Sequence, residues 1–194
     1  MEKLDLSFQN NERAKKGSLL ISDPFMNDLY FGRSVVLLCE HNNDGTFGFV
    51  LNNYIDIDLH KMDETFPDIG ARISFGGPMA KENLFFIHSL GKEITESIMI
   101  GEDLYYSGNF DEMIALLSKK PELNSKVRFF VGYSGWGIGQ LDDELKEHSW
   151  IPVNNIPVEM IMNTSNDKLW ANCLELQGER FKMISKFPKN PSDN

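Results

Sequence analysis

Ser134 has the surroundings most like those of a catalytic side chain. It lies between two glycines at the end of the apolar run in VRFFVGYSGWGIGQLDDEL, residues 127–145. A hydrolase nucleophile on a strand-to-helix turn follows the pattern G-x-S-x-G, in which the second glycine makes room for a strained serine. Trp136 occupies that second glycine position, so the local context fits and the motif does not. A serine hydrolase also needs a histidine and an acid. The chain has four histidines, and none lies in a recognisable partner motif: His41, His60, His88 and His148.

Two interpretations of the stretch remain open. In the first, the glycines permit a tight turn and Ser134 caps a following helix through its free amides. In the second, a strand that ends in glycines before a helix offers unpaired amides to a small anionic ligand. Neither a Walker A nor a G-x-G-x-x-G pattern is present, and the acidic run at 142–144 weakens any anion field. The structural interpretation is therefore favoured, with a small-ligand site as the alternative.

A second group of polar residues lies in CEHNNDG, where Glu40, His41 and Asp44 are close in sequence. A strand alternates its faces, so Glu40 and His41 point apart and make a poor metal site. We predict no metal and no cofactor. The glycines of SFGGPM, residues 74–79, indicate a tight turn, and Arg33 is a candidate partner for a carboxylate.

Charge is unevenly distributed along the chain. The net charge is −10, and residues 17–177 carry eleven basic against twenty-four acidic side chains. A body this acidic repels a phosphate backbone, so direct binding of nucleic acid by the folded part is disfavoured. The chain has no apolar run near the ~20 residues that a membrane span needs and no apolar leader, so we predict a cytoplasmic protein.

The two cysteines, Cys39 and Cys173, both lie in apolar segments without metal-ligand spacing. We expect both thiols to be buried as small apolar side chains, in agreement with an intracellular location. A redox pair would need the two sulfurs to be neighbours in space.

Short apolar segments separated by turn residues predict many strands. The NNDG turn at 42–45 joins strands at 33–41 and 46–51, and so short a loop predicts an antiparallel hairpin. The first of these strands has four consecutive apolar residues, so we expect both of its faces to be covered. Further strands are predicted at 17–22, 83–90 and 126–134, with another that begins at 71 and runs into the Gly-Gly-Pro turn at 76–78, and a pair within 97–108 joined at Gly101-Glu102.

The helices are fewer. The clearest covers 109–120, where Asn109 can cap the first turn and Glu112 can reach back. Its apolar face is formed by Phe110, Met113, Ile114 and Leu117. A second helix is predicted over 136–148, a third at about 166–176, and a short one within 57–66. The apolar side of the second would be formed by Ile138, Leu141 and Leu145.

These elements predict the α+β class, with a mixed, partly antiparallel sheet and flanking helices. The length of 194 residues fits one domain. We predict a polar N-terminal arm at 1–16, a single domain over 17–177 with room for a small lobe, and a basic, flexible tail at 178–194.

Three stretches in order resemble the AlgH/YqgE family of bacterial proteins. They are residues 17–52, SFGGPM at 74–79, and GYSGWGIGQLDDEL at 132–145 with Ser149-Trp150 close behind. The resemblance covers residues 17–177 and implies a compact, cytosolic protein of mixed sheet and helices. Some members carry the label of transcriptional regulator, and the family supplies no agreed catalytic residue.

We predict a binding site from the family's recurring positions, at the place where the turns at 76–78 and 134–136 meet Arg33 and Asn52. Its residues would be Arg33, His41, Asn52, Gly76, Gly77, Ser134, Gly135, Trp136 and Gln140. The first hypothesis is a binding or indirect regulatory protein, whose partner would be a small molecule or a protein. The alternatives are an enzyme of unknown reaction that uses Arg33, the Gly76-Gly77 turn and Ser134, and a DNA-binding protein that uses its basic tails.

Overall fold

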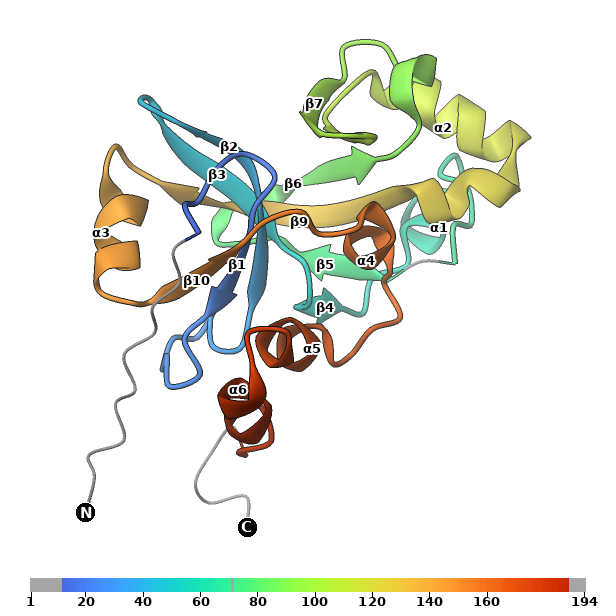
Figure 1. Ribbon diagram of the computed structural model, residues 1–194. Coiled ribbons are helices and arrows are strands. Elements are labelled where there is room, and N and C mark those ends of the chain that lie inside the picture. The colour runs from blue at the N-terminus through green and yellow to red at the C-terminus, as the bar shows by residue number, and fades with distance from the viewer. Residues whose placement is uncertain (1–11, 71, 189–194) are drawn as a thin grey trace, which may run out of the picture.

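The computed structural model describes residues 12–70 and 72–188, which form one curved sheet of ten strands with helices on its faces (Figure 1). The strands are β1 (Leu19–Ser22), β2 (Val35–Asn42), β3 (Gly45–Val50), β4 (Tyr54–Ile55), β5 (Ile73–Phe75), β6 (Met79–His88), β7 (Ile98–Gly101), β8 (Leu104–Tyr106), β9 (Val127–Trp136) and β10 (Trp150–Val153). The helices are α1 (Leu59–Met62), α2 (Phe110–Lys119), α3 (Gln140–Lys146), α4 (Val158–Met162), α5 (Leu169–Glu175) and α6 (Glu179–Ile184). The α+β class with a mixed sheet is thus confirmed.

Strand β9 connects the two halves of the sheet. The main strand order is β10-β1-β2-β3-β9-β6-β8-β7, and β4 and β5 form a branch in which β5 pairs with β9. The β5–β9 pair is parallel, whereas the other pairs are antiparallel. Because β9 pairs with β3, β5 and β6, it places the first two family-like stretches beside the third, which begins within β9.

The predicted hairpin is confirmed as β2 and β3, with Val36 opposite Val50 and Asn42 opposite Gly45. Both faces of β2 are covered, as its continuous apolar sequence predicts. One face contributes to the central core, which contains Leu19, Ile21, Leu37, Cys39, Phe49, Leu51, Phe130 and the α5 residues Leu169, Trp170 and Cys173. The other contributes to the tryptophan core, which contains Leu20, Val36, Leu38, Val50, Trp136, Leu141 and Trp150.

The helix α2 packs on the β6–β9 half of the sheet. It buries Met113 and Leu117 against a third cluster that includes Phe66, Phe86 and Phe129. Asn109 caps the helix as predicted, because its side chain accepts a hydrogen bond from the Glu112 amide. The predicted return bond from the Glu112 side chain is wrong. That carboxylate instead accepts bonds from the backbone amide and hydroxyl of Thr95, which fixes the loop before β7.

The helix after β9 begins later than the sequence predicts. The strand continues through Trp136, and α3 starts only at Gln140 after the left-handed residue Gly139. Leu141 is buried and Leu145 is partly buried, as expected. Ile138 precedes the helix and is 78% exposed, so its inward assignment is wrong.

The predicted flexible tail contains ordered structure. Residues Glu179–Ile184 form α6, Ile184 is buried, and Phe181 packs against the central core. Residues 189–194 lie outside the described part of the chain, as do 1–11 of the predicted arm. Within that arm, Glu12 accepts a hydrogen bond from the Asn154 amide, and Lys16 pairs with Glu40.

A buried arginine ties β9 to neighbouring segments. Arg128 has no solvent exposure and donates hydrogen bonds to the carbonyls of Leu51 and Ile161 and to the Ser74 hydroxyl. Burial lowers the pKa of Arg128 to about 10. Arg128 is the one charged residue of the β9 sequence, and it is not among the predicted site residues.

Candidate functional site

The glycine-rich stretches meet at one buried point, the carbonyl of Gly76. This oxygen accepts hydrogen bonds from the Val50 amide and from the Ser134 hydroxyl, each at 2.9 Å. The Gly76 amide donates to the Val131 carbonyl at 2.8 Å. The bonds therefore join β3, the β5–β6 turn and β9, and we call Gly48, Gly76, Gly77, Gly132 and Ser134 the glycine junction.

Close approach of backbones explains the glycines of this junction. A Cβ atom added to Gly48 would lie 2.1 Å from the Leu37 carbonyl oxygen, and one on Gly76 would lie 2.3 Å from the Gly132 oxygen. At Gly77 it would meet the Ser134 Oγ at 2.3 Å, and the φ of +149° is itself unfavourable for other residues. The glycine junction is thus a crossing of three chain segments.

Ser134 is a buried member of this crossing rather than a helix cap. It lies inside β9, opposite Gly48 of β3 and six residues before α3 begins. Its hydroxyl donates to Gly76, and the side chain has no solvent exposure. Three of the histidines that a serine hydrolase could use form hydrogen bonds to groups other than Ser134: His41 to Thr46, His60 to the Phe66 carbonyl, and His88 to Ser97.

Arg33 and Asn52 contact each other, but neither side chain contributes to the glycine junction. The Asn52 side chain accepts from the Val35 amide and donates to the Arg33 carbonyl, which fixes the start of β2. The Arg33 guanidinium lies 5.0 Å from the centre of the Trp170 ring and donates to the Phe187 carbonyl. The expected carboxylate partner of Arg33 is replaced by an aromatic ring and a carbonyl near the C-terminal helix.

Trp136 and Gln140 converge on one acid, Glu144. The Trp136 indole N–H donates to Glu144 Oε2 at 2.8 Å, and Trp150 donates to the same oxygen at 2.7 Å. Gln140 donates to Glu144 Oε1 at 3.0 Å. Trp136 is 6% exposed and its ring stacks on Phe31. These contacts bind α3 to the sheet.

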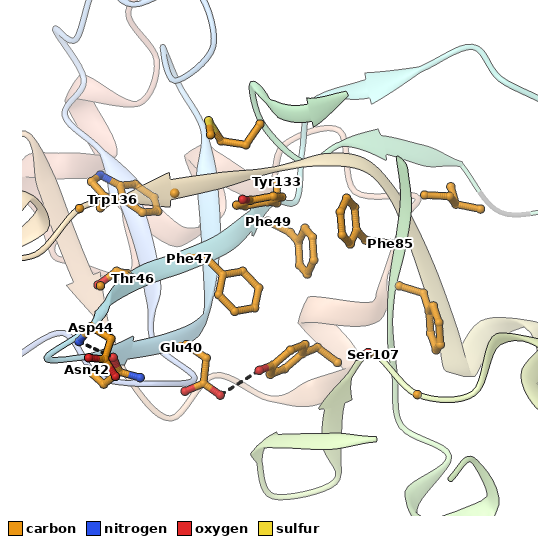
Figure 2. Close-up of a pocket in the computed structure, with 18 of the residues that line it drawn as sticks. Glu40, Asn42, Asp44, Thr46, Phe47, Phe49, Phe85, Ser107, Tyr133 and Trp136 are labelled. Atoms are coloured by element: carbon orange, nitrogen blue, oxygen red, sulfur yellow. Dashed lines mark hydrogen bonds between the residues drawn. The ribbon is translucent and has the colours of Figure 1, made fainter. Parts of the chain in front are cut away.

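An aromatic cleft of about 990 Å³ opens on the other side of β9, between the β2–β3 hairpin and the β6–β8 segment (Figure 2). The rings that line it are Phe47, Phe49, Phe85, Phe86, Tyr106, Phe110, Tyr133 and Trp136. Its polar lining side chains are Glu40, Asn42, Asp44, Thr46 and Ser107. Pockets of about 300–1,000 Å³ with mostly apolar walls are typical of small-molecule sites.

The rings of the cleft hold one another edge to face. Phe47 lies 5.2 Å from Tyr106 and 5.9 Å from Tyr133, and Phe85 lies 5.6 Å from Tyr133, measured between ring centres. Figure 2 shows Phe47, Phe49, Phe85 and Tyr133 gathered in the middle of the cleft. Phe47, Phe85, Tyr106 and Tyr133 are only partly buried and pack against the central core. The cleft is therefore an uncovered end of that core.

The cleft is acidic. Glu40 and Asp44 line it, and none of its described lining residues is a lysine, arginine or histidine. Glu40 Oε1 accepts the Tyr106 hydroxyl at 3.0 Å, drawn as a dashed line in Figure 2, and pairs with Lys16 Nζ at 2.6 Å. Burial, together with the Glu40 carboxylate, raises the pKa of Tyr106, so its hydroxyl stays a donor at neutral pH.

The structure therefore divides the nine predicted site residues. Gly135 and Trp136 line the aromatic cleft, whereas His41 lines a separate depression beside Trp150. Gly76, Gly77 and Ser134 form the junction behind it, and Arg33, Asn52 and Gln140 make structural bonds elsewhere. Sequence reasoning missed Phe47, Phe85, Tyr106 and Tyr133. The available signal was the aromatic alternation Phe47, Phe49 in β3, which looks the same as that of a core strand.

Glu40 and His41 do point apart, because Glu40 lines the aromatic cleft and His41 lines the separate depression beside Trp150. Within residues 12–70 and 72–188, no group of three or more histidine, cysteine, aspartate or glutamate side chains is arranged to hold a metal ion. Cys39 and Cys173 are both free and buried, and burial raises the pKa of each thiol, that of Cys173 to about 11. Over the same described ranges, no helix has the length and apolar character needed to cross a membrane.

Comparison with known proteins agrees with this fold. The AlgH-like family model matches residues 19–182. A UPF0301 protein of Parabacteroides distasonis is 41% identical over 180 residues, covering 91% of this chain and 89% of the relative. A UPF0301 protein of Cytophaga hutchinsonii is 38% identical, covering 92% of this chain and 98% of the relative.

Two solved structures share the architecture. A crystal structure of a Corynebacterium diphtheriae protein has a TM-score of 0.73 at 24% identity, covering 93% of this chain and 95% of its own. The solution structure of the AlgH protein from Pseudomonas aeruginosa has a TM-score of 0.67 at 25% identity, covering 93% and 99%. Family model, sequence relatives and fold agree, and the chain belongs to the AlgH-like family.

Proposed function

We propose that this protein is a binding protein whose aromatic cleft takes a small apolar molecule that is neutral or positively charged. The observation that carries the proposal is the combination of eight lining rings, two lining carboxylates and no basic side chain among the described lining residues. Rings supply apolar area and favourable edge and face contacts, whereas the two lining acids, Asp44 and the Lys16-paired Glu40, give the cleft wall no cationic partner for an anion. Nucleotides and other phosphate compounds are therefore disfavoured as ligands.

The positions of the reactive side chains favour binding over catalysis. The hydroxyl of Ser134 is occupied by the Gly76 carbonyl and is closed to solvent, so the enzyme alternative loses its nucleophile. The Tyr106 hydroxyl is held against Glu40. Ser134 donates to a backbone carbonyl rather than to a base, and the Glu40 carboxylate that accepts the Tyr106 hydroxyl raises the pKa of Tyr106 instead of lowering it, so neither group is an activated nucleophile.

A regulatory role would be indirect under this proposal. Residues 17–177 carry eleven basic against twenty-four acidic side chains, which disfavours contact with a phosphate backbone. The helix after β9 that would have to enter a groove begins with Asp142 and Asp143 in its first turn. Transcriptional effects would then pass through a ligand or a protein partner rather than through DNA contact.

The test uses two aromatic probes and amide NMR spectra of the full chain. We expect 2-phenylethanol to shift resonances of residues in β3, β6 and β9 that line the cleft, and phenylacetate to bind at least about tenfold more weakly because of the carboxylates. A Gly135→Leu variant places a side chain beside Tyr133 and Met79 and should block the alcohol. Gly101→Leu, at a position with open space around it, is the matched control. Shifts scattered away from the cleft, or equal binding of both probes, would refute the proposal.

A further inference from the structure

Lys16 reaches the cleft wall from outside the sheet. It lies just before β1, and its Nζ is 2.6 Å from Glu40 Oε1. The same Nζ lies 5.7 Å from the centre of the Tyr106 ring. The ammonium group thus has a carboxylate partner and a nearby aromatic face, which are the two kinds of group that recognise alkylammonium ions.

The Glu40 carboxylate has a second partner besides Lys16. Glu40 is part of β2, and its Oε1 also accepts the Tyr106 hydroxyl, so its position is fixed from a second strand. Its side chain is 26% exposed and that of Lys16 is 30% exposed. The pair is partly buried but still open to solvent on one side, so solvent screens it and another solute can reach it. Another ammonium group can therefore exchange with Lys16 at small cost.

We propose that Glu40 and Tyr106 form an ammonium subsite of the aromatic cleft, and that Lys16 occupies this subsite until a ligand's amine replaces it. The ligand class is then a small primary amine with an aromatic or branched apolar body. Its ammonium would bind Glu40 and its apolar body would contact Phe47, Phe85 and Tyr133. This inference rests on the proposed binding function of the cleft and names the chemistry of its ligand.

Replacement of Lys16 carries a distinctive consequence. Its ammonium competes with the ligand for one carboxylate, so removing it should strengthen binding of an amine and leave binding of a neutral analogue unchanged. Asp44, the other lining carboxylate, lies near the hairpin turn, where its backbone amide is bonded to the Asn42 side chain. Glu40, whose carboxylate contacts both the Lys16 ammonium and the Tyr106 hydroxyl, is the acid whose loss should remove the preference for a cation.

The experiment compares 2-phenylethylammonium with 2-phenylethanol by NMR titration of the full chain. These probes share the same apolar body and differ in the charged group. Lys16→Met should raise affinity for the ammonium probe at least about fivefold, the size of a partly screened ion pair, and leave affinity for the alcohol unchanged. Glu40→Gln should bring the two affinities together. Lys15→Met, which removes an adjacent exposed lysine, is the control and should change neither.

The outcomes separate the two proposals. Failure of both probes to bind the cleft would overturn the binding function and this inference together. Binding of the alcohol with no gain for the ammonium probe in Lys16→Met would overturn the ammonium subsite alone. An unchanged preference for the ammonium probe in Glu40→Gln would also overturn it.

Discussion

Ser134 and Tyr133 are adjacent on β9, but they belong to two different kinds of structure. Ser134 points into the glycine junction, where its hydroxyl is bonded and its surface is closed. Tyr133 points into the aromatic cleft, where its ring is partly exposed among other rings. Because successive side chains of a strand face opposite sides, one segment serves both regions. The residues that stand out most in this sequence, the glycines and Ser134, fix the backbone at a crossing of strands. Their less distinctive aromatic neighbours form the accessible surface of the cleft.

The largest expected effect is at the glycine junction. Gly77→Ala would place a methyl group 2.4 Å from the Tyr133 backbone and 2.3 Å from Ser134 Oγ, at a φ of +149°. We expect a loss of about 5 kcal/mol in unfolding free energy, or failure to fold, because backbone atoms cannot move aside. Chemical denaturation measures it. Gly101→Ala, with no atom near its added carbon, should stay within about 0.5 kcal/mol of wild type, and equal losses in both variants would contradict this account.

Trp136 belongs to both regions, since its ring packs in the tryptophan core and also lines the cleft. Trp136→Ala should lower unfolding free energy by about 3–5 kcal/mol, the range for a large buried aromatic. Trp136→Phe keeps most of the packing and removes only the bond to Glu144, so its loss should be clearly smaller. A Trp136→Ala protein as stable as wild type would show that the ring serves the cleft rather than the core.

How much could be predicted depended on the kind of signal. The β2–β3 hairpin and the Asn109 cap follow from local letters, the NNDG turn and an Asn before an apolar face, and both are confirmed. The sequence predicts Ser134 at a turn that caps a helix, whereas it lies inside β9. Glycines at 132 and 135 fit a tight turn as well as they fit a close crossing of strands. The decisive contact, to Gly76, is 58 residues away in sequence.

The cleft could not be predicted for a related reason. Phe47, Phe85 and Tyr133 have the alternation of core residues, and their partial exposure in the cleft depends on how strands far apart in the sequence pack together. The start of α3 was predicted too early because the four residues from Trp136 to Gly139 can follow a helical period without forming a helix. Fold class depends on many local signals, whereas a site depends on a few distant contacts.

Strand β6 ends at a buried histidine that offers a pH-dependent test of stability. His88 is fully buried, donates from Nε2 to Ser97, and accepts the Leu90 amide at Nδ1. Burial lowers the pKa of His88 below its usual 6.5, so the folded protein binds fewer protons than the unfolded chain. Stability should be complete above about pH 6.5 and fall as the pH drops below it.

Denaturant titrations at pH values from about 7.5 to about 5, on either side of the usual histidine pKa, measure how unfolding free energy changes with pH. His88→Gln should flatten this dependence whatever its effect on stability at neutral pH. A slope that is unaffected by His88→Gln would assign the acid sensitivity to other groups.

The most direct test of the division between junction and cleft compares Ser134→Ala with Tyr133→Leu, each measured for unfolding free energy and for 2-phenylethanol binding. Ser134→Ala should cost about 1 kcal/mol through its lost hydrogen bond and bind the alcohol as wild type does. Tyr133→Leu should bind at least about tenfold more weakly while folded, because an aromatic wall of the cleft is lost. Loss of binding in Ser134→Ala, with full binding in Tyr133→Leu, would contradict the account.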